Sequence, residues 1–190
     1  SCKQLTQAMN NKGFFQAQID TIVQRENRKI DLIYNITAND PYSIGQYVVN
    51  FENEELDNIA NNPRATLIQP GMQFDADLMN QERQRVASAM RRRGYFYFDQ
   101  ELIQYVADST KRTGVIDVEM KLNDYIDAHE DKEKIFRKYN ISKVYFHIDY
   151  DPSRIPDNSE MQIVSHEGYL FTWVGKKLLR ENVLIRNCPI

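Results

Sequence analysis

An internal repeat constrains this 190-residue chain more strongly than any other feature of its sequence. The segment AMNNKGFF, which begins at Ala8, returns at Ala89 as AMRRRGYF, a shift of 81 positions. Each copy is typical of a helix that ends at a glycine, Gly13 or Gly94, and is followed by an aromatic pair. Because repeated segments fold alike, the elements of one copy predict those of the other.

Apolar residues alternate with polar ones in two further pairs of matching segments. At a shift of 86, Ile30, Leu32, Tyr34 and Ile36 correspond to Ile116, Val118, Met120 and Leu122. At a shift of 97, Tyr47, Val49 and Phe51 correspond to Val144, Phe146 and Ile148. A period of two predicts strands that each have one buried face. The growing shift indicates insertions in the later copy, around residues 109–114 and 124–138.

One complete repeat is predicted over residues 42–124, in the order strand, helix, helix, strand, strand. A strand at 44–51 leads to a short helix at 54–61, which ends before Pro63 because the residue preceding a proline disfavours the helical region. Asp75 is expected to cap a long helix that ends at Gly94, with Phe74 packed on Met79. Two strands, at 100–109 and 115–123, then form a hairpin.

The rest of the chain is predicted to hold incomplete repeats. Residues 1–41 supply the end of a helix and two strands, which is the second half of a unit. Residues 125–138 are mixed in charge and are predicted to be a linker, either a rigid helix or a flexible hinge. Residues 139–190 begin a third unit and then depart from the pattern, with a polar loop at 151–167, an aromatic strand at 169–174 and a helix near 178–187. We expect a fragment of a longer array, cut inside repeats at both ends.

Composition and motifs argue against an enzyme. The chain has 24 Lys+Arg and 27 Asp+Glu, a net charge of −3, and no apolar run long enough to span a bilayer. His129, His147 and His166 stand in separate segments, and Cys2 and Cys188 lie near opposite ends without a metal or redox spacing. Phosphate-binding and nucleophile motifs are absent from the sequence. We therefore predict no catalytic residue, no metal site and no cofactor.

A cluster of arginines on the long helix supports an alternative function. Five of them lie from Arg83 to Arg93, close to aromatic residues, and would suit a nucleic-acid-binding repeat protein. Helical geometry places Arg85 and Arg92 opposite the apolar stripe and distributes the others around the helix. Since the net charge is also negative, a solvated helix face is the preferred interpretation, and nucleic acid is not expected as a partner.

The segments that flank the long helix resemble a known family. The sequence QPGMQFD precedes this helix at residues 69–75, RGYF follows it at 93–96, and YVAD stands at 105–108. In this order they resemble the POTRA (polypeptide-transport-associated) domains of BamA/TamA-like outer-membrane assembly factors of Bacteroidetes type. The resemblance is good over residues 42–123, fair over 1–41 and weak after Asp151. It implies an α+β fold of tandem β-α-α-β-β units, each a small three-stranded mixed sheet covered by two helices. The third unit is either such a domain with an inserted aromatic hairpin or a different connector.

The resemblance also implies a function and partners. POTRA arrays stand in the periplasm, tethered to the outer membrane by a C-terminal β-barrel that lies outside these residues. They are thought to receive unfolded β-barrel precursors, and accessory lipoproteins are a further partner to be expected from the resemblance. We therefore expect a periplasmic scaffold of an outer-membrane assembly factor. An exposed apolar surface at an incomplete repeat would favour a dimer or strand exchange.

The resemblance places the client-binding site on one strand edge. The first strand after the long helix, at 101–108, would present an unpaired backbone to a client strand, a mode of binding that makes little demand on sequence. The site residues are then Leu102, Ile103, Gln104, Tyr105 and Val106, and a proline at Val106 is expected to remove an N–H of that edge. The opposing interpretation is that the neighbouring repeat covers this edge.

Overall fold

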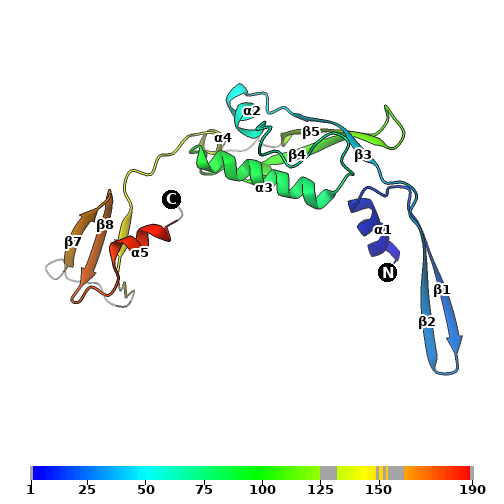
Figure 1. Ribbon diagram of the computed structural model, residues 1–190, viewed down its shortest axis with the longest axis horizontal. Coiled ribbons are helices and arrows are strands. Elements are labelled where there is room, and N and C mark those ends of the chain that lie inside the picture. The colour runs from blue at the N-terminus through cyan, green and yellow to red at the C-terminus, as the bar shows by residue number, and fades with distance from the viewer. Residues whose placement is uncertain (1, 125–131, 149, 152, 154–160, 189–190) are drawn as a thin grey trace. The chain divides into compact units, whose positions relative to one another are not determined.

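The computed structural model describes residues 2–124, 132–148, 150, 151, 153 and 161–188 (Figure 1). The chain divides into two compact units, residues 1–139 and residues 140–190. Within the first of these, a helix and a β-hairpin precede a complete α+β domain, which we call the central domain and which spans residues 42–124.

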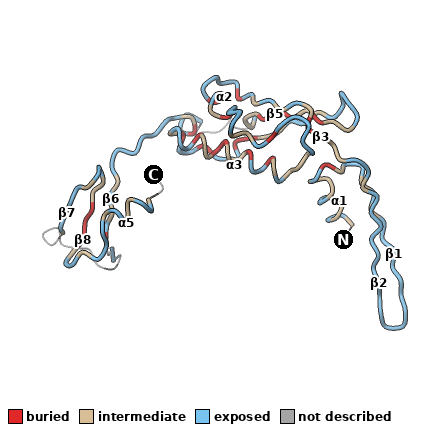
Figure 2. The backbone as a smooth tube through the Cα atoms, in the orientation of Figure 1, coloured by how far each residue is buried: buried red, intermediate tan, exposed pale blue. Residues whose placement is uncertain are grey.

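The N-terminal segment is a helix followed by a two-stranded hairpin. Helix α1 (Cys2–Asn11) leads to β1 (Gln18–Glu26), which pairs antiparallel with β2 (Lys29–Thr37). A left-handed Asn27, at φ 53°, makes the turn between the two strands. The expected strands are therefore present, but the expected buried face is wrong. Every residue of β2 is exposed, because no other described strand or helix covers it (Figure 2).

The central domain has the predicted order of elements. These are β3 (Ser43–Val49), α2 (Glu54–Ala60), α3 (Ala76–Arg92), a 3₁₀ turn η1 (Gln100–Leu102), β4 (Ile103–Asp108) and β5 (Val115–Leu122). The strand order is β3-β5-β4, with β3 parallel and β4 antiparallel to the middle strand β5. This is a three-stranded mixed sheet with two helices, and the predicted fold class is confirmed. One difference is local: Asp99 caps a 3₁₀ turn, so the strand expected from residue 100 begins at Ile103.

Caps and apolar spacing explain where the helices of the central domain lie. Asn53 accepts hydrogen bonds from the backbone of Glu55 and Leu56 at the start of α2, and Asp75 accepts one from Asp77 at the start of α3. Under these helices lies a core with fully buried side chains from both helices and all three strands, among them Ile44, Val86, Met90, Phe98, Ile103 and Met120. The sheet is thus buried on its helical face, whereas the residues of the other face are half-buried or exposed.

Part of the predicted linker packs against the central domain. A short helix, α4 (Lys132–Ile135), places Ile135 in the core with 7% exposure, and Phe136 lies 6.5 Å from Phe98 between ring centres. Tyr139 is held there too, since its N–H donates to the carbonyl of Gly94 at 2.8 Å. Residues 125–131 of the predicted linker lie outside the described residues, so for them the interpretation stays a prediction.

The second compact unit repeats the sheet topology of the central domain. Strands β6 (Tyr145–His147), β7 (Met161–His166) and β8 (Tyr169–Val174) form a sheet of order β6-β8-β7, again with one parallel and one antiparallel pair. Helix α5 (Glu181–Arg186) packs Leu184 and Ile185 on the aromatic core. The aromatic strand and the last helix are where the sequence predicts them. The polar loop at 151–167 is wrong for its second half, which forms β7.

Candidate functional site

The direction of the backbone groups in β5 shows which residues of β4 face the open edge. In the central domain the carbonyl of Met120 accepts a hydrogen bond from Asn50, next to β3, at 2.9 Å. The N–H of Asn123 donates to the carbonyl of Leu102, next to β4, also at 2.9 Å. Because both backbone groups of a strand residue point to the same side, even-numbered residues of β5 face β3 and odd-numbered ones face β4.

The pairing register carries this alternation over to β4. Gln104, Val106 and Asp108 lie opposite the odd-numbered residues of β5, so their backbone groups are bonded to β5. Ile103, Tyr105 and Ala107 face the other way, toward an edge with which no described strand pairs. A strand edge of this kind can accept another strand by backbone hydrogen bonds. We call the backbone of Tyr105 and Ala107 the open edge.

Ile103 faces the edge but its backbone groups are already bonded. Its N–H donates to Gln100 in the 3₁₀ turn. Its carbonyl accepts a hydrogen bond from Nη1 of Arg83, on α3, at 3.2 Å. The open edge is therefore two residues long, with two backbone groups at each residue.

The five residues predicted to bind a client occupy different positions at this edge. Leu102 is buried in the 3₁₀ turn, and Gln104 and Val106 use their backbone groups within the sheet. Tyr105 is the one predicted residue whose backbone groups belong to the open edge. A proline at Val106 would break the sheet rather than the edge, which corrects the expectation for that position. Two residues at this edge were not predicted, Ala107 and Arg83. Register explains the first, but nothing in the sequence marks the contact of Arg83.

The side chains around the open edge are mostly neutral. Tyr105 turns its ring under α3 and donates its hydroxyl to the carbonyl of Met79 at 3.0 Å. Burial, followed by the charge of nearby groups, holds the pKa of Tyr105 well above its ordinary value, so this phenol stays protonated. On the opposite face of β4, Val106 is 44% exposed. The edge can therefore offer backbone hydrogen bonds and apolar contact, which suits an extended peptide of varied sequence.

The other edge of the sheet is partly covered by the chain itself. At the start of β3, Ile44 exchanges backbone hydrogen bonds of 2.7 Å with Met72 and Gly71, and Tyr42 accepts one from Phe74. A bulge follows, where the N–H of Gln46 donates to the Asp117 carboxylate at 3.0 Å. Of the two outer strands, β4 is the more accessible to a partner strand.

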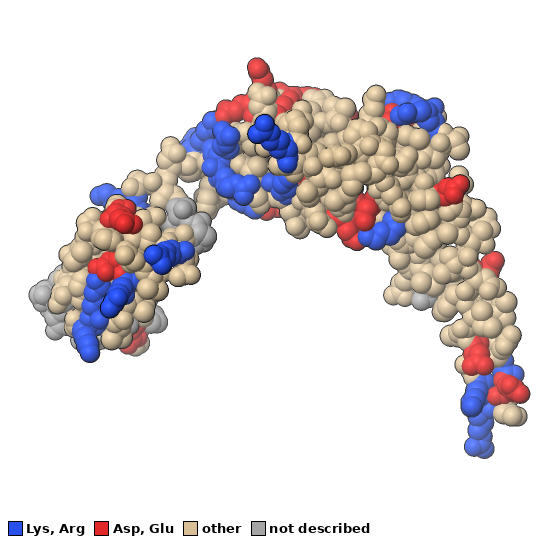
Figure 3. Space-filling view, in the orientation of Figure 1, with Lys and Arg blue, Asp and Glu red and all other residues tan. Residues whose placement is uncertain are grey.

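The arginines of α3 are largely committed to contacts inside the domain. Arg85 forms a two-pronged ion pair with Glu82 at 2.8 Å and also donates to the carbonyl of Ala60. Its side chain is only 14% exposed, which corrects the prediction that it points away from the core. Arg91 donates to the carbonyl of Phe98 and pairs with Asp99. Basic side chains do gather at the C-terminal end of α3 and around α4 (Figure 3). Three of the five predicted arginines are nonetheless engaged, which leaves no continuous basic stripe along the helix.

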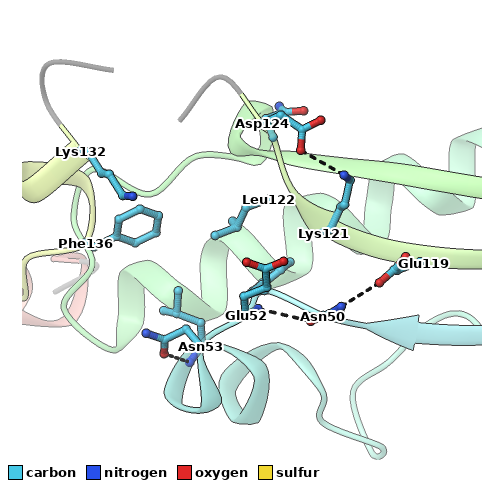
Figure 4. Close-up of a pocket in the computed structure, with 12 residues that line it drawn as sticks. Asn50, Glu52, Asn53, Glu119, Lys121, Leu122, Asp124, Lys132 and Phe136 are labelled. Carbon is cyan, nitrogen blue, oxygen red and sulfur yellow. Dashed lines mark hydrogen bonds and ion pairs between the residues drawn. The ribbon is translucent and has the colours of Figure 1, made fainter. Parts of the chain in front are cut away.

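A cavity of about 610 Å³ opens where the parallel strands β3 and β5 end (Figure 4). Its apolar wall includes Phe51, Leu56, Leu122 and Phe136. Its polar side chains pair largely with one another: Asn50 donates to Glu119 at 2.9 Å, and Lys121 pairs with Asp124 at 3.0 Å. These contacts brace the end of the sheet, and they form no reactive cluster of the kind that acid–base chemistry needs.

The described residues hold neither a metal-binding cluster nor a membrane-spanning helix. No group of three or more His, Cys, Asp or Glu within the described ranges is placed to hold a metal ion. None of the helices that the structure describes is both long enough and apolar enough to cross a bilayer.

Known proteins resemble the chain in structure but not detectably in sequence. No protein-family model and no curated protein matches it. A crystal structure of Haemophilus influenzae BamA POTRA3-5 has a TM-score of 0.44 at 10% identity, over 92% of this chain and 78% of that one. BamA from Haemophilus ducreyi lacking POTRA domains 1-3 scores 0.43 at 14% identity, over 64% of this chain. The N-terminal domain of Omp85 from Thermosynechococcus elongatus scores 0.34 at 12% identity.

These likenesses are distant. The chain spans 21% of the Haemophilus ducreyi protein, so it corresponds to a small part of that molecule. The sequence of elements in the central domain, β3-α2-α3-β4-β5, and its sheet order are observations on this chain alone, and they agree with the fold that the sequence resemblance implies.

Proposed function

We propose that this chain is a periplasmic scaffold of an outer-membrane assembly factor, which holds unfolded β-barrel precursors by pairing a client strand with the open edge of β4. The observation that carries the proposal is the outward-facing backbone of Tyr105 and Ala107, on the edge of β4 with which no described strand pairs. Strand addition draws its affinity from the backbone, so one edge can serve clients of many sequences. The proposed activity is binding, without catalysis or a cofactor.

The length and chemistry of the edge support a weak and general binding site. Two residues with two backbone groups each offer four hydrogen bonds. A net contribution of about 1 kcal/mol for each bond would hold a client with about 4 kcal/mol before ordering costs. The exposed Val106 side chain adds apolar contact with alternate residues of the client. An alternating sequence, which is typical of transmembrane β-strands, suits such an edge.

The wider setting of this proposal comes from the sequence resemblance. It implies a periplasmic location, a tether to the outer membrane and accessory lipoproteins as partners, and these form part of the proposal. The second compact unit has the same sheet order, so its strand β7 lies at the equivalent edge and would offer a second site of the same kind. Dimerisation through an uncovered apolar surface stays a prediction.

Replacing Ala107 with proline tests the edge directly. Ala107→Pro removes an outward N–H and places a ring where the client backbone would lie, while an edge strand tolerates the substitution. We expect the affinity for a labelled peptide of about ten residues, copied from one strand of an outer-membrane barrel protein, to fall about tenfold. Fluorescence anisotropy measures this affinity.

A matched variant controls for changes in the side chain. Ala107→Val keeps the N–H and favours the extended conformation, so its affinity should equal that of the unmodified chain. Circular dichroism and the protection of β5 amides from hydrogen exchange report whether the sheet survives in both variants. Equal peptide affinity for Ala107→Pro and Ala107→Val, in an intact sheet, would show that clients do not dock on β4.

A further inference from the structure

The position of Arg83 determines where the open edge of β4 stops. Its Nη1 donates to the carbonyl of Ile103 at 3.2 Å, and its Nη2 donates to Oδ1 of Asn80, one turn earlier on α3, at 2.8 Å. The two terminal nitrogens of the guanidinium are thus bonded to different elements, Nη2 to the helix and Nη1 to the strand. Ile103 is the next outward-facing residue after Tyr105, so Arg83 occupies the acceptor that would continue the edge.

The partly buried position of the Arg83 side chain lowers the folding stability of the central domain. The contact with Ile103 is therefore more than an incidental surface pairing. The Nε atom of Arg83 is buried and has no hydrogen-bond partner among the described residues. A buried donor without an acceptor is unfavourable, and a shorter side chain would avoid it. Charged side chains at a strand edge are also a common means of preventing unwanted strand pairing.

We propose that Arg83 caps the β4 edge and thereby sets the length of the client segment that can pair with it. A client running along β4 forms hydrogen-bonded pairs at every second residue, opposite Ala107 and then Tyr105. The next pair would fall opposite Ile103, where the client's N–H meets the guanidinium instead of a free carbonyl. The client must leave the sheet at this point, so three of its residues span the whole paired segment.

This inference rests on the proposed function, because it concerns the same edge. The change in client affinity expected on removing Arg83, however, has the opposite sign to that expected on removing a residue that contacts the client. A residue that contacts a ligand weakens binding when it is removed. A cap strengthens binding when it is removed, because it frees an acceptor. Arg83→Met keeps the aliphatic stem and removes every donor of the fork, so it frees the carbonyl of Ile103 while preserving much of the packing.

The experiment compares peptides of increasing length on matched variants. The probes are strand-forming peptides of alternating sequence, acetylated and amidated at their ends, able to pair over three, five or seven residues. For the unmodified chain, affinity should stop rising once three residues can pair. For Arg83→Met, the longer peptides should bind about fivefold more tightly, which is the effect of roughly one additional hydrogen bond.

Two control variants separate the cap from changes in charge. Arg92→Met removes an exposed arginine from the last turn of the same helix and should behave like the unmodified chain. Arg83→Lys keeps a donor that can reach Ile103 and should keep the length limit. Weaker binding by Arg83→Met, or an unchanged length dependence, would overturn the cap. Protection of β5 amides from exchange shows that each variant is folded.

Self-association gives a second readout that needs no peptide. If no peptide binds the unmodified chain, the proposed function fails, and the cap is then judged by edge-to-edge pairing between copies. Sedimentation equilibrium should show Arg83→Met associating about fivefold more tightly than Arg92→Met. Equal association of the two variants would overturn the cap independently of the proposed function.

Discussion

The carboxylate of Glu82 is fully buried, and its contacts connect three parts of the central domain. It pairs with Arg85 at 2.8 Å, accepts the backbone N–H of Leu67 at 3.0 Å and faces the hydroxyl of Tyr47 at 3.4 Å. Burial, and then the charge of Glu82, raise the pKa of Tyr47 well above its ordinary value, so this hydroxyl remains a donor. Together these bonds attach α3 to the loop that follows α2.

Removing the charge of Glu82 should destabilise the central domain strongly. Glu82→Gln leaves the Arg85 guanidinium in a mostly buried site without its counter-charge, and breaking such a pair from one side costs about 3–5 kcal/mol. Urea unfolding followed by circular dichroism measures the loss. The double variant Glu82→Met/Arg85→Met should lose less free energy of unfolding than the sum of the losses of Glu82→Met alone and Arg85→Met alone. A Glu82→Gln variant within about 0.5 kcal/mol of the unmodified chain would contradict this account.

Some residue-scale features could be predicted from the sequence and others could not. The helix cap at Asp75 involves only residues that follow it directly in the sequence, so it could be predicted. The burial of Arg85 depends on the carbonyl of Ala60, 25 positions away, and on a buried Glu82 one turn earlier. A helical wheel drawn from the apolar residues therefore placed Arg85 in solvent, because it contains no information on where α2 lies.

Among the elements, β2 and β5 show the same pattern with opposite burial. Ile30 of β2 corresponds to Ile116 of β5 in the internal repeat. Ile30 is 63% exposed, whereas Ile116 is 6% exposed beneath the helices of the central domain. Both strands were predicted from their alternation, since this depends on the residues of the strand itself. Burial could not be predicted in the same way, because it depends on which other elements cover the face.

This pair of isoleucines allows a test in which residue type and repeat position are both held constant. Ile116→Ala should lower the free energy of unfolding by about 2–5 kcal/mol, because it leaves a cavity in a packed core. Ile30→Ala should change it by no more than about 0.5 kcal/mol. Hydrogen exchange at the amides of β5 measures the first effect. A similar loss for both variants would mean that the hairpin face is covered in solution.

The edge strand illustrates the same limit. The sequence placed a strand after α3, and β4 is found there. Which of its residues face outward depends on register with β5, and a difference of one residue exchanges the two sets. Val106 and Ala107 are thus indistinguishable by pattern, yet only Ala107 belongs to the open edge. The strand β7 was missed because neighbouring polar residues hid its short apolar part, Ile163 and Val164.

At the scale of the whole chain, the repeat also duplicates a junction. The N–H of Tyr42 donates to the carbonyl of Gly13 at 2.9 Å, and the N–H of Tyr139 donates to that of Gly94 at 2.8 Å. Both glycines are left-handed, at φ 86° and 98°, and a Cβ at either would lie 3.0 Å from a backbone oxygen. Glycine is required at both places, and the tyrosine that opens each following segment is held by the same bond.

An ion pair beside the first junction makes its stability depend on pH. The ammonium of Lys12 lies 2.9 Å from Asp75 and 2.8 Å from Asp77. Hydrogen bonding to Lys12 lowers the pKa of Asp75, and bonding to Asp77 and Asp75 raises the pKa of Lys12. The contribution of Asp75 is present above its ordinary pKa and is lost as the pH falls through the lowered value. The contribution of Lys12 is lost as the pH rises through its raised value. The ion pair should therefore stabilise the junction most between about pH 4 and pH 10.

The amide of Tyr42 reports on this junction, since it donates to Gly13 next to Lys12. Its protection from hydrogen exchange, corrected for the intrinsic rate, should fall as the pH is lowered from about 5 to about 3. Lys12→Met should show lower protection at pH 5 and a smaller fall. The amide of Met120, in the middle of β5, serves as the internal control. Equal pH dependence in the two proteins would show that the ion pair does not secure the junction.

The shortness of the open edge determines how long a client would stay. A site of two β4 residues, worth about 4 kcal/mol before ordering costs, corresponds to a dissociation constant of roughly 1 mM or weaker. With an association rate of about 10⁶ M⁻¹s⁻¹, the residence time is about a millisecond or less. A client would then leave and rebind many times while it is being handed on, with no step needed to release it. An edge extended by one more hydrogen bond, to the carbonyl of Ile103, would slow each departure about fivefold, and Arg83 would keep the exchange fast.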